Sequence, residues 1–146
     1  GWDAVIATNL TGTWNLTQAA ANKWMLDHGG RIISITMNTV RGFPGMTHST
    51  AARAGVEGMS RTLAVEWASH DIQVNCIAPG GVDTPQMRGS TASAEVFNDR
   101  NQGHPMGRVG SADEMANLVL WLASDEASYV SGSTYTIDGG AMASAT

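Results

Sequence analysis

The spacing of apolar residues along this chain predicts three helices that alternate with short apolar strands. Residues 3–27 carry apolar side chains at steps of three and four, which is the pattern of a helix with one buried face. Residues 48–69 show the same pattern. A third helix is predicted to start at Ser111, where Ser111 and Glu114 have the spacing of a capping box.

Three short runs rich in β-branched residues follow the three predicted helices, one after each. We interpret residues 31–36, 72–78 and 133–137 as buried strands, because glycine or proline residues follow each run. Strands that alternate with crossover helices form a parallel sheet covered on both faces. The order therefore predicts an α/β fold with about three parallel strands and flanking helices.

Residues 85–110 lack clear periodicity and contain scattered Gly, Ser and Asn. Loops this long in a compact domain commonly cover or line a binding site. We therefore expect a substrate-binding lid here, within a single domain of residues 1–146. Because the sequence starts inside a helical pattern without an initiator Met, we also expect it to be the C-terminal half of a longer protein.

Composition limits the classes of function. The chain has 146 residues, 42% of them hydrophobic and 14% charged, which is typical of a globular protein. A net charge of −5 without a basic cluster argues against nucleic acid as a partner. No apolar run approaches the roughly 20 residues of a membrane helix, and no signal peptide is visible, so we expect no membrane attachment and a cytoplasmic location.

The single cysteine, Cys76, excludes an internal disulfide and a cysteine-based zinc site. It lies within the second predicted strand, so we expect a buried, inert thiol. No other pattern indicates a metal site.

Candidate catalytic groups lie around the end of the first predicted strand. Thr36 ends that strand, Ser49 follows 13 residues later at the start of the next helix, and Arg53 lies one turn further. Ligands of parallel sheets bind beyond the carboxyl ends of the strands. These side chains can therefore converge on one substrate, although each also has a structural explanation: a strand end for Thr36, a helix cap for Ser49, and a solvated side chain for Arg53.

Four motifs in this order resemble the short-chain dehydrogenase/reductase family. They are Asn9-Leu10-Thr11-Gly12, the Thr36, Ser49 and Arg53 spacing, Ile77-Ala78-Pro79-Gly80-Gly81-Val82-Asp83-Thr84, and Tyr135-Thr136-Ile137-Asp138-Gly139-Gly140. The resemblance covers nearly the whole chain. It implies a Rossmann-like, doubly wound parallel sheet, of which this chain is the C-terminal half, and NADP or NAD as cofactor. The family's glycine-rich phosphate-binding turn is absent here and by resemblance belongs to the N-terminal half.

The resemblance also implies roles for individual residues. The implied catalytic residues are Asn9, which holds a water in a proton relay, Thr36, Ser49 and Arg53. The implied cofactor-binding residues are Arg53 at the nicotinamide ribose, Pro79, Gly80 and Val82 at the nicotinamide, and Thr84 at the pyrophosphate.

The chain departs from the family at the site of proton donation. The family has Tyr-x-x-x-Lys where this chain has Ser49 and Arg53, and a guanidinium cannot give up a proton. Carbonyl reduction needs an acid at the alkoxide, whereas an enoyl thioester needs only hydrogen-bond donors at its oxygen. We therefore expect an NAD(P)-dependent oxidoreductase acting on an enoyl-CoA-like substrate. Within the family, residues 48–56 most resemble the peroxisomal trans-2-enoyl-CoA reductase and 2,4-dienoyl-CoA reductase branch, and this resemblance implies a link to fatty acid metabolism.

The sequence is also compatible with three alternatives to an enoyl-CoA reductase. These are an alcohol or carbonyl dehydrogenase of the same family, a non-catalytic family member, and a fragment without independent function. His48 is an alternative acid for the site. By resemblance we also expect a homo-oligomer, such as a homotetramer, that pairs through helices 3–27 and 48–69 and the C-terminal strand.

Overall fold

The computed structural model describes residues 1–40, 43–90 and 104–144. In chain order the elements are α1 (Trp2–Ile6), η1 (Ala7–Thr11), α2 (Gly12–Ala20), η2 (Ala21–Met25), α3 (Leu26–His28), β1 (Gly30–Ile35), α4 (Thr47–Glu66), η3 (Ala68–His70), β2 (Ile72–Pro79), β3 (Val82–Asp83), α5 (Pro85–Ser90), β4 (Gly110–Ser111), α7 (Ala112–Ala123), η4 (Asp125–Ala127) and β5 (Thr134–Ile137).

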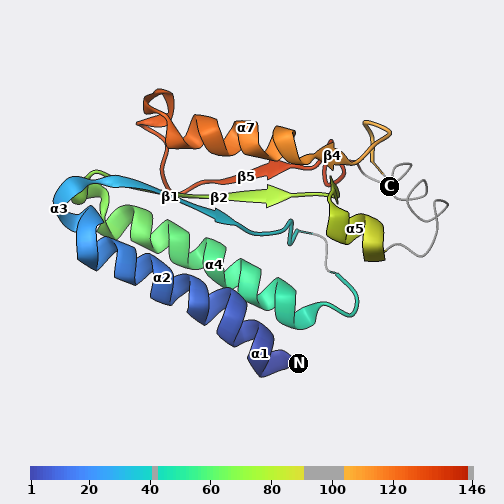
Figure 1. The fold of residues 1–146 in the computed structure, drawn as a ribbon, viewed down its shortest axis with the longest axis horizontal. Helices are drawn as coiled ribbons and strands as arrows, with labels where there is room; N and C mark the ends of the chain where they lie inside the picture. The colour runs from blue at the N-terminus through green and yellow to red at the C-terminus, as the bar shows by residue number, and fades with distance from the viewer. Residues whose placement is uncertain (41–42, 91–103, 145–146) are drawn as a thin grey trace.

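A parallel sheet in the order β1–β2–β5 forms the centre of the molecule. The layer of α2 and α4 covers one face of this sheet and α7 covers the other (Figure 1). The predicted α/β fold with three parallel strands and flanking helices is confirmed. All three strands run in one direction, so their carboxyl ends meet at a single edge near α5 (Figure 1).

The predicted first helix is a continuous rod from α1 to α3 that contains two π-helical turns, η1 and η2. Asn9 lies in the first of these turns. Single π turns within helices often mark functional sites. The rod ends at Gly29, whose φ of 71° is a left-handed conformation that glycine adopts without steric cost.

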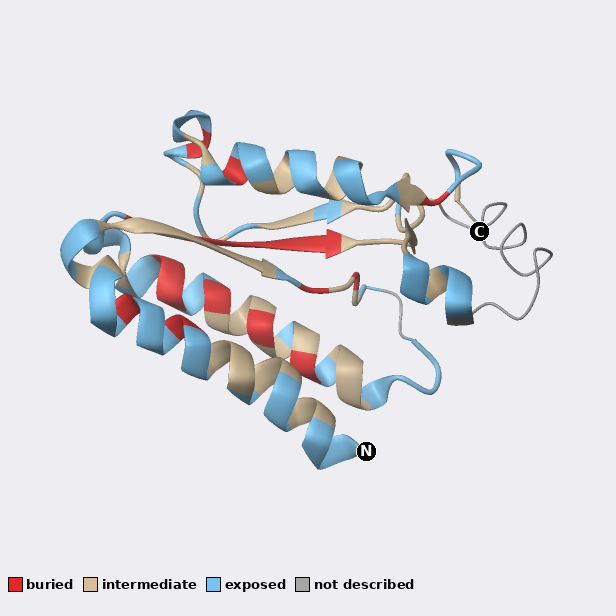
Figure 2. Cartoon of the chain, viewed as in Figure 1, coloured by how far each residue is buried: buried red, intermediate tan, exposed pale blue. Residues whose placement is uncertain are grey.

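The core lies on both sides of β2. This strand is buried over most of its length because it is central in the sheet, and α4 buries the stripe that faces it (Figure 2). Cys76 of β2 is fully buried, donates to Oγ of Ser60 at 3.2 Å, and has its pKa raised by burial. The predicted buried thiol is confirmed.

A short parallel ladder between β3 and β4 was not predicted. Val82 pairs with Gly110 and Asp83 with Ser111. Two-residue strands are too short to show a period in the sequence, so their pairing depends on the surrounding fold.

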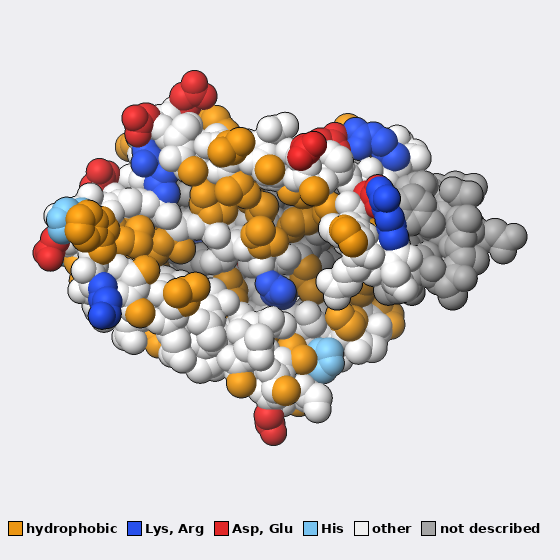
Figure 3. Space-filling view, viewed as in Figure 1, with side chains coloured by type: hydrophobic (Ala, Val, Ile, Leu, Met, Phe, Trp, Pro, Cys, Tyr) orange, Lys and Arg blue, Asp and Glu red, His pale blue; other side chains and the backbone are white. Residues whose placement is uncertain are grey.

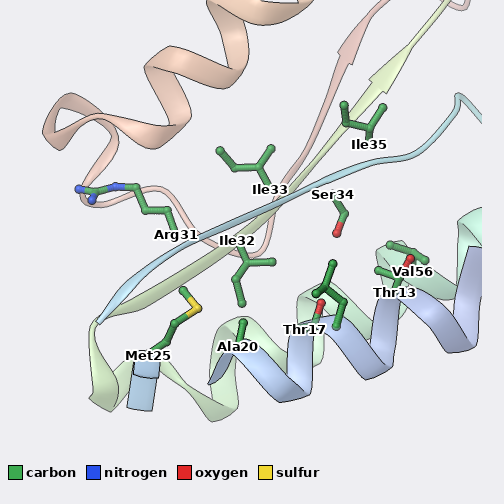
Figure 4. Close-up of a pocket in the computed structure, with 11 residues that line it drawn as sticks. Thr13, Thr17, Ala20, Met25, Arg31, Ile32, Ile33, Ser34, Ile35 and Val56 are labelled. Atoms are coloured by element: carbon green, nitrogen blue, oxygen red, sulfur yellow. The ribbon is translucent and has the colours of Figure 1, made fainter. Parts of the chain in front are cut away.

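The outer edge of β1 borders an apolar groove of about 360 Å³ between this strand and α2. Ile33 and Ile35 point toward the α7 side of the sheet, whereas Ile32 and Ser34 point toward the layer of α2 and α4 (Figure 4). Ile35 is 56% exposed and Leu16 is 74% exposed. Figure 3 shows apolar side chains gathered across the middle of the face of the molecule seen in that view, between α7 and α2.

No helix in the described ranges is both long enough and apolar enough to cross a membrane.

Close packing between η1 and α4 depends on a small residue. A Cβ at Gly55 of α4 would lie 3.0 Å from Cδ1 of Leu10 in η1, whereas a Cβ at Gly58 would have only Nη2 of Arg61 nearby, at 3.9 Å. Both glycines lie inside the same helix. Alanine substitutions at these two glycines therefore form a matched pair, in which the change in helix propensity is the same and only the packing against Leu10 differs.

We expect Gly58→Ala to raise the free energy of unfolding by about 1 kcal/mol, because alanine favours a helix interior. Gly55→Ala gains the same propensity but has to displace the Leu10 side chain, so we expect it to be less stable than Gly58→Ala. Urea unfolding of the full-length protein measures both. Equal stabilisation by the two substitutions would contradict the close contact.

Candidate functional site

A pocket of about 530 Å³ lies at the carboxyl ends of β1, β2 and β5. Its lining comes from the segments that follow these strands, from α5, and from the segment before β4. The lining residues are Met37, Asn38, Phe43, Pro79, Gly80, Gly81, Met87, His104, Asp138, Ala141 and Met142. We term it the strand-end pocket, and its place agrees with the general position of ligand sites in parallel sheets.

Two of the predicted catalytic residues reach the end of β1 from α4. The hydroxyl of Ser49 donates a long hydrogen bond to Sδ of Met37, at 3.8 Å. Arg53 donates from Nη1 to the carbonyl of Ile35 at 2.5 Å. The structure thus brings Ser49 and Arg53 to the same strand end. Ser49 contacts Met37 of the pocket lining, whereas the partner of Arg53, Ile35, lines the groove along β1.

Thr36 is not part of this lining. It is buried, and its hydroxyl lies 3.0 Å from Oε1 of Glu57 and 3.1 Å from the carbonyl of Ile77. The single hydroxyl proton is therefore directed toward α4 and β2, beneath the pocket. Met37, the next residue, lines the pocket instead.

Strand alternation in the sequence contains the signal for this difference. Successive side chains of a strand point to opposite faces, so Thr36 belongs with Ser34, which points toward the helices (Figure 4). A strict reading of the alternation would have placed the threonine hydroxyl on the side of α4 and β2. Met37 lies beyond the end of β1 at Ile35, so the alternation does not predict its direction.

Asn9 lies half-buried in η1, next to Leu10, which packs against Gly55 of α4. Its carbonyl accepts a hydrogen bond from Oγ1 of Thr13 at 2.9 Å. Within the described ranges, no direct hydrogen bond joins its side chain to Ser49 or Arg53. The predicted water relay through Asn9 stays a prediction.

His48, the alternative acid, also lies outside the lining. Its Nδ1 accepts the backbone N–H of Ser49 at 2.7 Å. Its ring lies beside the start of α1, where a Cβ at Gly1 would be 4.0 Å from Cδ2.

The segment after β2 contributes backbone to the pocket. The N–H of Gly80 donates to the carbonyl of Ile137 at 3.0 Å, and a Cβ at Gly80 would lie 2.7 Å from Cβ of Asp138. Only glycine fits there. Val82 is held in β3, and the hydroxyl of Thr84 accepts the N–H of Met87 at 3.1 Å, which caps the start of α5.

The turn after β5 joins two sides of the pocket. Asp138 accepts the N–H groups of Gly140 at 2.9 Å and Met142 at 3.0 Å. Asn38, which is 5% exposed, approaches the same carboxylate with its amide nitrogen at 3.4 Å. These contacts connect the exit of β1 to the exit of β5.

A carboxylate at the start of α7 supports the β3–β4 ladder. Glu114 accepts two bonds from Arg108, at 2.7 and 2.8 Å, and one from the N–H of Ser111 at 2.8 Å. Arg108 and then Ser111 lower the pKa of Glu114 to about 2. The predicted capping box is confirmed. Because Gly110 donates to the carbonyl of Gly81 at 2.9 Å, this cap anchors one wall of the pocket.

Part of the predicted lid at 85–110 is visible. Its first residues form α5, and its last residues form the turn and strand before α7. Residues 91–103 lie outside the described ranges. In the parts of the chain that are described, no group of His, Cys, Asp and Glu could hold a metal ion.

Comparison with known proteins places the chain in a family. Residues 1–142 match the family described as enoyl-(acyl carrier protein) reductase. The 3-oxoacyl-[acyl-carrier-protein] reductase FabG of Chlamydia muridarum is 40% identical over 140 residues, covering 95% of this chain and 56% of the relative. The peroxisomal 2,4-dienoyl-CoA reductase of Mus musculus is 40% identical over 141 residues, covering 93% and 47%.

A solved structure supports the same relationship. A candidate 2-deoxy-d-gluconate 3-dehydrogenase from Agrobacterium tumefaciens, solved with bound NADP, superposes with a TM-score of 0.90 at 34% identity. The superposition covers 98% of this chain and 59% of that one. The Rossmann-like character of the sheet is thereby confirmed. The chain spans about half the length of the curated relatives it matches.

The Glu114 cap generates a pH-dependent prediction. The pKa of this carboxyl falls from 4.5 to about 2 on folding, so its contribution to stability is complete above pH 4.5 and is lost as the pH falls toward 2. We expect Glu114→Gln to lower the urea midpoint of the full-length protein at pH 7, and the difference from wild type to shrink below pH 4.5. A difference that stays constant down to pH 2 would contradict this account. Glu126→Gln, at an exposed acid beyond the end of α7, is the control.

Proposed function

The chain belongs to the short-chain dehydrogenase/reductase family, and from this premise we propose that the full-length protein is an NAD(P)-dependent reductase of enoyl thioesters such as an enoyl-CoA. The observation that carries this proposal is the chemistry of the strand-end pocket. It combines an apolar lining with the Ser49 hydroxyl at Met37, has Arg53 at the end of the neighbouring strand β1, and has no phenol among its described lining residues. The chain's two tyrosines lie elsewhere: Tyr129 is fully exposed, and Tyr135 packs edge-on against Trp121.

The apolar lining supports an acyl substrate. Met37, Met87 and Met142 contribute thioethers, and Phe43 contributes a ring. Methionine side chains adapt to irregular apolar shapes, which suits a flexible acyl chain. The two relatives above carry names that describe reductases of acyl groups on acyl carrier protein or CoA, which is consistent with this substrate class.

The residues present fit the nicotinamide end of a dinucleotide cofactor. The side chain of Arg53 uses one N–H on Ile35 and has further donors for the ribose hydroxyls. The backbone of Pro79, Gly80 and Val82 would lie against the nicotinamide, with Thr84 toward the pyrophosphate. When bound, NADP or NAD supplies the hydride. The NADP in the Agrobacterium structure supports this choice of cofactor.

The chain's own groups would then stabilise charge on the substrate. The hydroxyl of Ser49 and a water held by Asn9 would donate to the thioester oxygen as it becomes negative. The charge of Arg53 would favour the same anion. Thr36 would act from beneath, by holding the exit of β1 against Glu57 and Ile77.

We further propose that the chain is the C-terminal part of one cofactor-binding domain. The open edge of β1 and its apolar groove would then accept a parallel strand from the rest of the protein. The exposure of Ile35 and Leu16 supports this arrangement.

The proposed homo-oligomer would use surfaces that the sheet leaves uncovered. Ala51, Ala54 and Val65 of α4 are exposed, and β5 forms the other edge of the sheet. Gly55 does not contribute to that surface, because it packs against Leu10 within the chain.

A reductase of carbonyl groups is the second candidate. The names of the Chlamydia and Agrobacterium relatives favour it. Turnover of acetoacetyl-CoA distinguishes it from enoyl reduction, and a non-catalytic protein would turn over neither substrate.

We expect the full-length protein to oxidise NADPH or NADH with crotonyl-CoA faster than with acetoacetyl-CoA, because the pocket margin lacks a phenol acid. Cofactor absorbance follows both reactions. Faster turnover of acetoacetyl-CoA supports the carbonyl reductase, and no turnover on either substrate or on a panel of aldehydes and ketones removes the catalytic proposal.

We expect Arg53→Ala to weaken cofactor binding about 10-fold to 100-fold, since hydrogen bonds from a charged donor contribute about 1.5–3 kcal/mol. Isothermal titration of the full-length protein with NADPH and NADH measures this. Arg61→Ala is the matched control, because Arg61 is exposed on the same helix two turns later. Equal affinity in the two variants would mean that Arg53 does not hold the cofactor.

A further inference from the structure

Reduction of an enoyl thioester takes up a proton as well as a hydride, so the pocket needs a group that can deliver one. The search for this proton donor rests on the proposed reduction of an enoyl thioester. The hydroxyl proton of Thr36 is directed into the interior, and the guanidinium of Arg53 keeps its protons. Two titratable residues belong to the described pocket lining, Asp138 and His104.

Asp138 is an acceptor in this structure. Its two oxygens receive the N–H groups of Gly140 and Met142, and the Asn38 amide approaches one of them. Asp138 therefore holds the turn after β5, with both of its oxygens occupied as acceptors.

His104 lies against the segment that follows β2. It begins the turn that precedes β4, where the N–H of Gly107 donates to its carbonyl at 2.7 Å. Its imidazole lies against the backbone of Gly81: a Cβ at Gly81 would be 3.2 Å from both Cε1 and Nε2. Gly81 itself lines the pocket and is fixed to β4 through Gly110.

Two pairs of charged groups lie on the elements that neighbour Gly81 and His104. Arg88 of α5 makes two hydrogen bonds to Asp83 of β3, at 2.5 and 2.6 Å. Arg108 makes its two bonds to Glu114 of α7. Both pairs lower the pKa of the acid, so these carboxyls are charged at neutral pH. Asp138, the carboxylate of the described pocket lining, accepts backbone N–H groups as described above.

We propose that His104 is the proton donor of the strand-end pocket. The β carbon of the substrate accepts the hydride from the reduced cofactor, and the electron pair of the C=C bond moves toward the thioester carbonyl. The imidazolium N–H bond of His104 breaks, its proton forms the new C–H bond at the α carbon, and the carbonyl is restored. The neutral imidazole then regains a proton from water.

The kinetic test uses the full-length protein with NADPH and crotonyl-CoA. Imidazole is the side chain that exchanges a proton near neutral pH, so wild-type kcat should fall as the pH rises through the histidine range. His104→Gln keeps a hydrogen-bonding side chain but loses the titration. We expect its kcat to fall about 10²-fold to 10⁴-fold and the pH dependence in that range to disappear, with cofactor affinity unchanged.

Two comparisons make this test specific. His70→Gln is the matched control, because His70 lies in η3 and bonds to the carbonyl of Leu26, away from the pocket. It should keep the wild-type kcat and pH profile. A His104→Gln variant with wild-type kcat and pH profile would overturn the proposal while leaving enoyl reduction intact.

A spectroscopic test works on the wild-type protein without turnover. Ring signals of labelled histidine, with His104 assigned through the spectrum of His104→Asn, should shift when crotonyl-CoA is added. Unchanged His104 signals in the presence of bound crotonyl-CoA would overturn the proposal. Absence of any turnover by wild type, in contrast, would overturn the proposed function itself.

Discussion

Parallel strand pairing is the constraint on which the rest of this structure depends. Because β1, β2 and β5 run in one direction, their carboxyl ends meet at one edge, and the segments that follow them line a single pocket. Met37, Gly80 and Asp138 are far apart in the sequence and come together only through this pairing. An antiparallel arrangement of the same strands would separate them.

Much of the fold follows from local patterns in the sequence. The helical period of residues 3–27 and 48–69, the capping box at Ser111 and the β-branched runs all predict elements that the structure contains. The β3–β4 ladder has no such pattern, since two-residue strands leave no periodic signal. The two π turns in the first helix also leave none, because one added residue barely disturbs the spacing of apolar side chains.

The site was harder to predict than the fold, because sequence spacing does not determine the direction of a side chain. The spacing of Thr36, Ser49 and Arg53 predicts which elements approach one another, and Ser49 and Arg53 do reach the end of β1. It does not determine which face of the strand each side chain takes, and a shift of one residue exchanges Thr36 for Met37. His104 lies in a segment without periodicity, so only the tertiary contact with Gly81 connects it to the pocket.

In the function proposed here, α4 and the segment after β2 form one cofactor crevice at the strand ends. A crystal structure of the full-length protein with bound NADP or NAD tests it most directly. We expect the nicotinamide ribose within hydrogen-bond distance of the Arg53 guanidinium and the nicotinamide ring against Pro79 and Gly80. A cofactor bound elsewhere, with Arg53 directed into solvent, would contradict it.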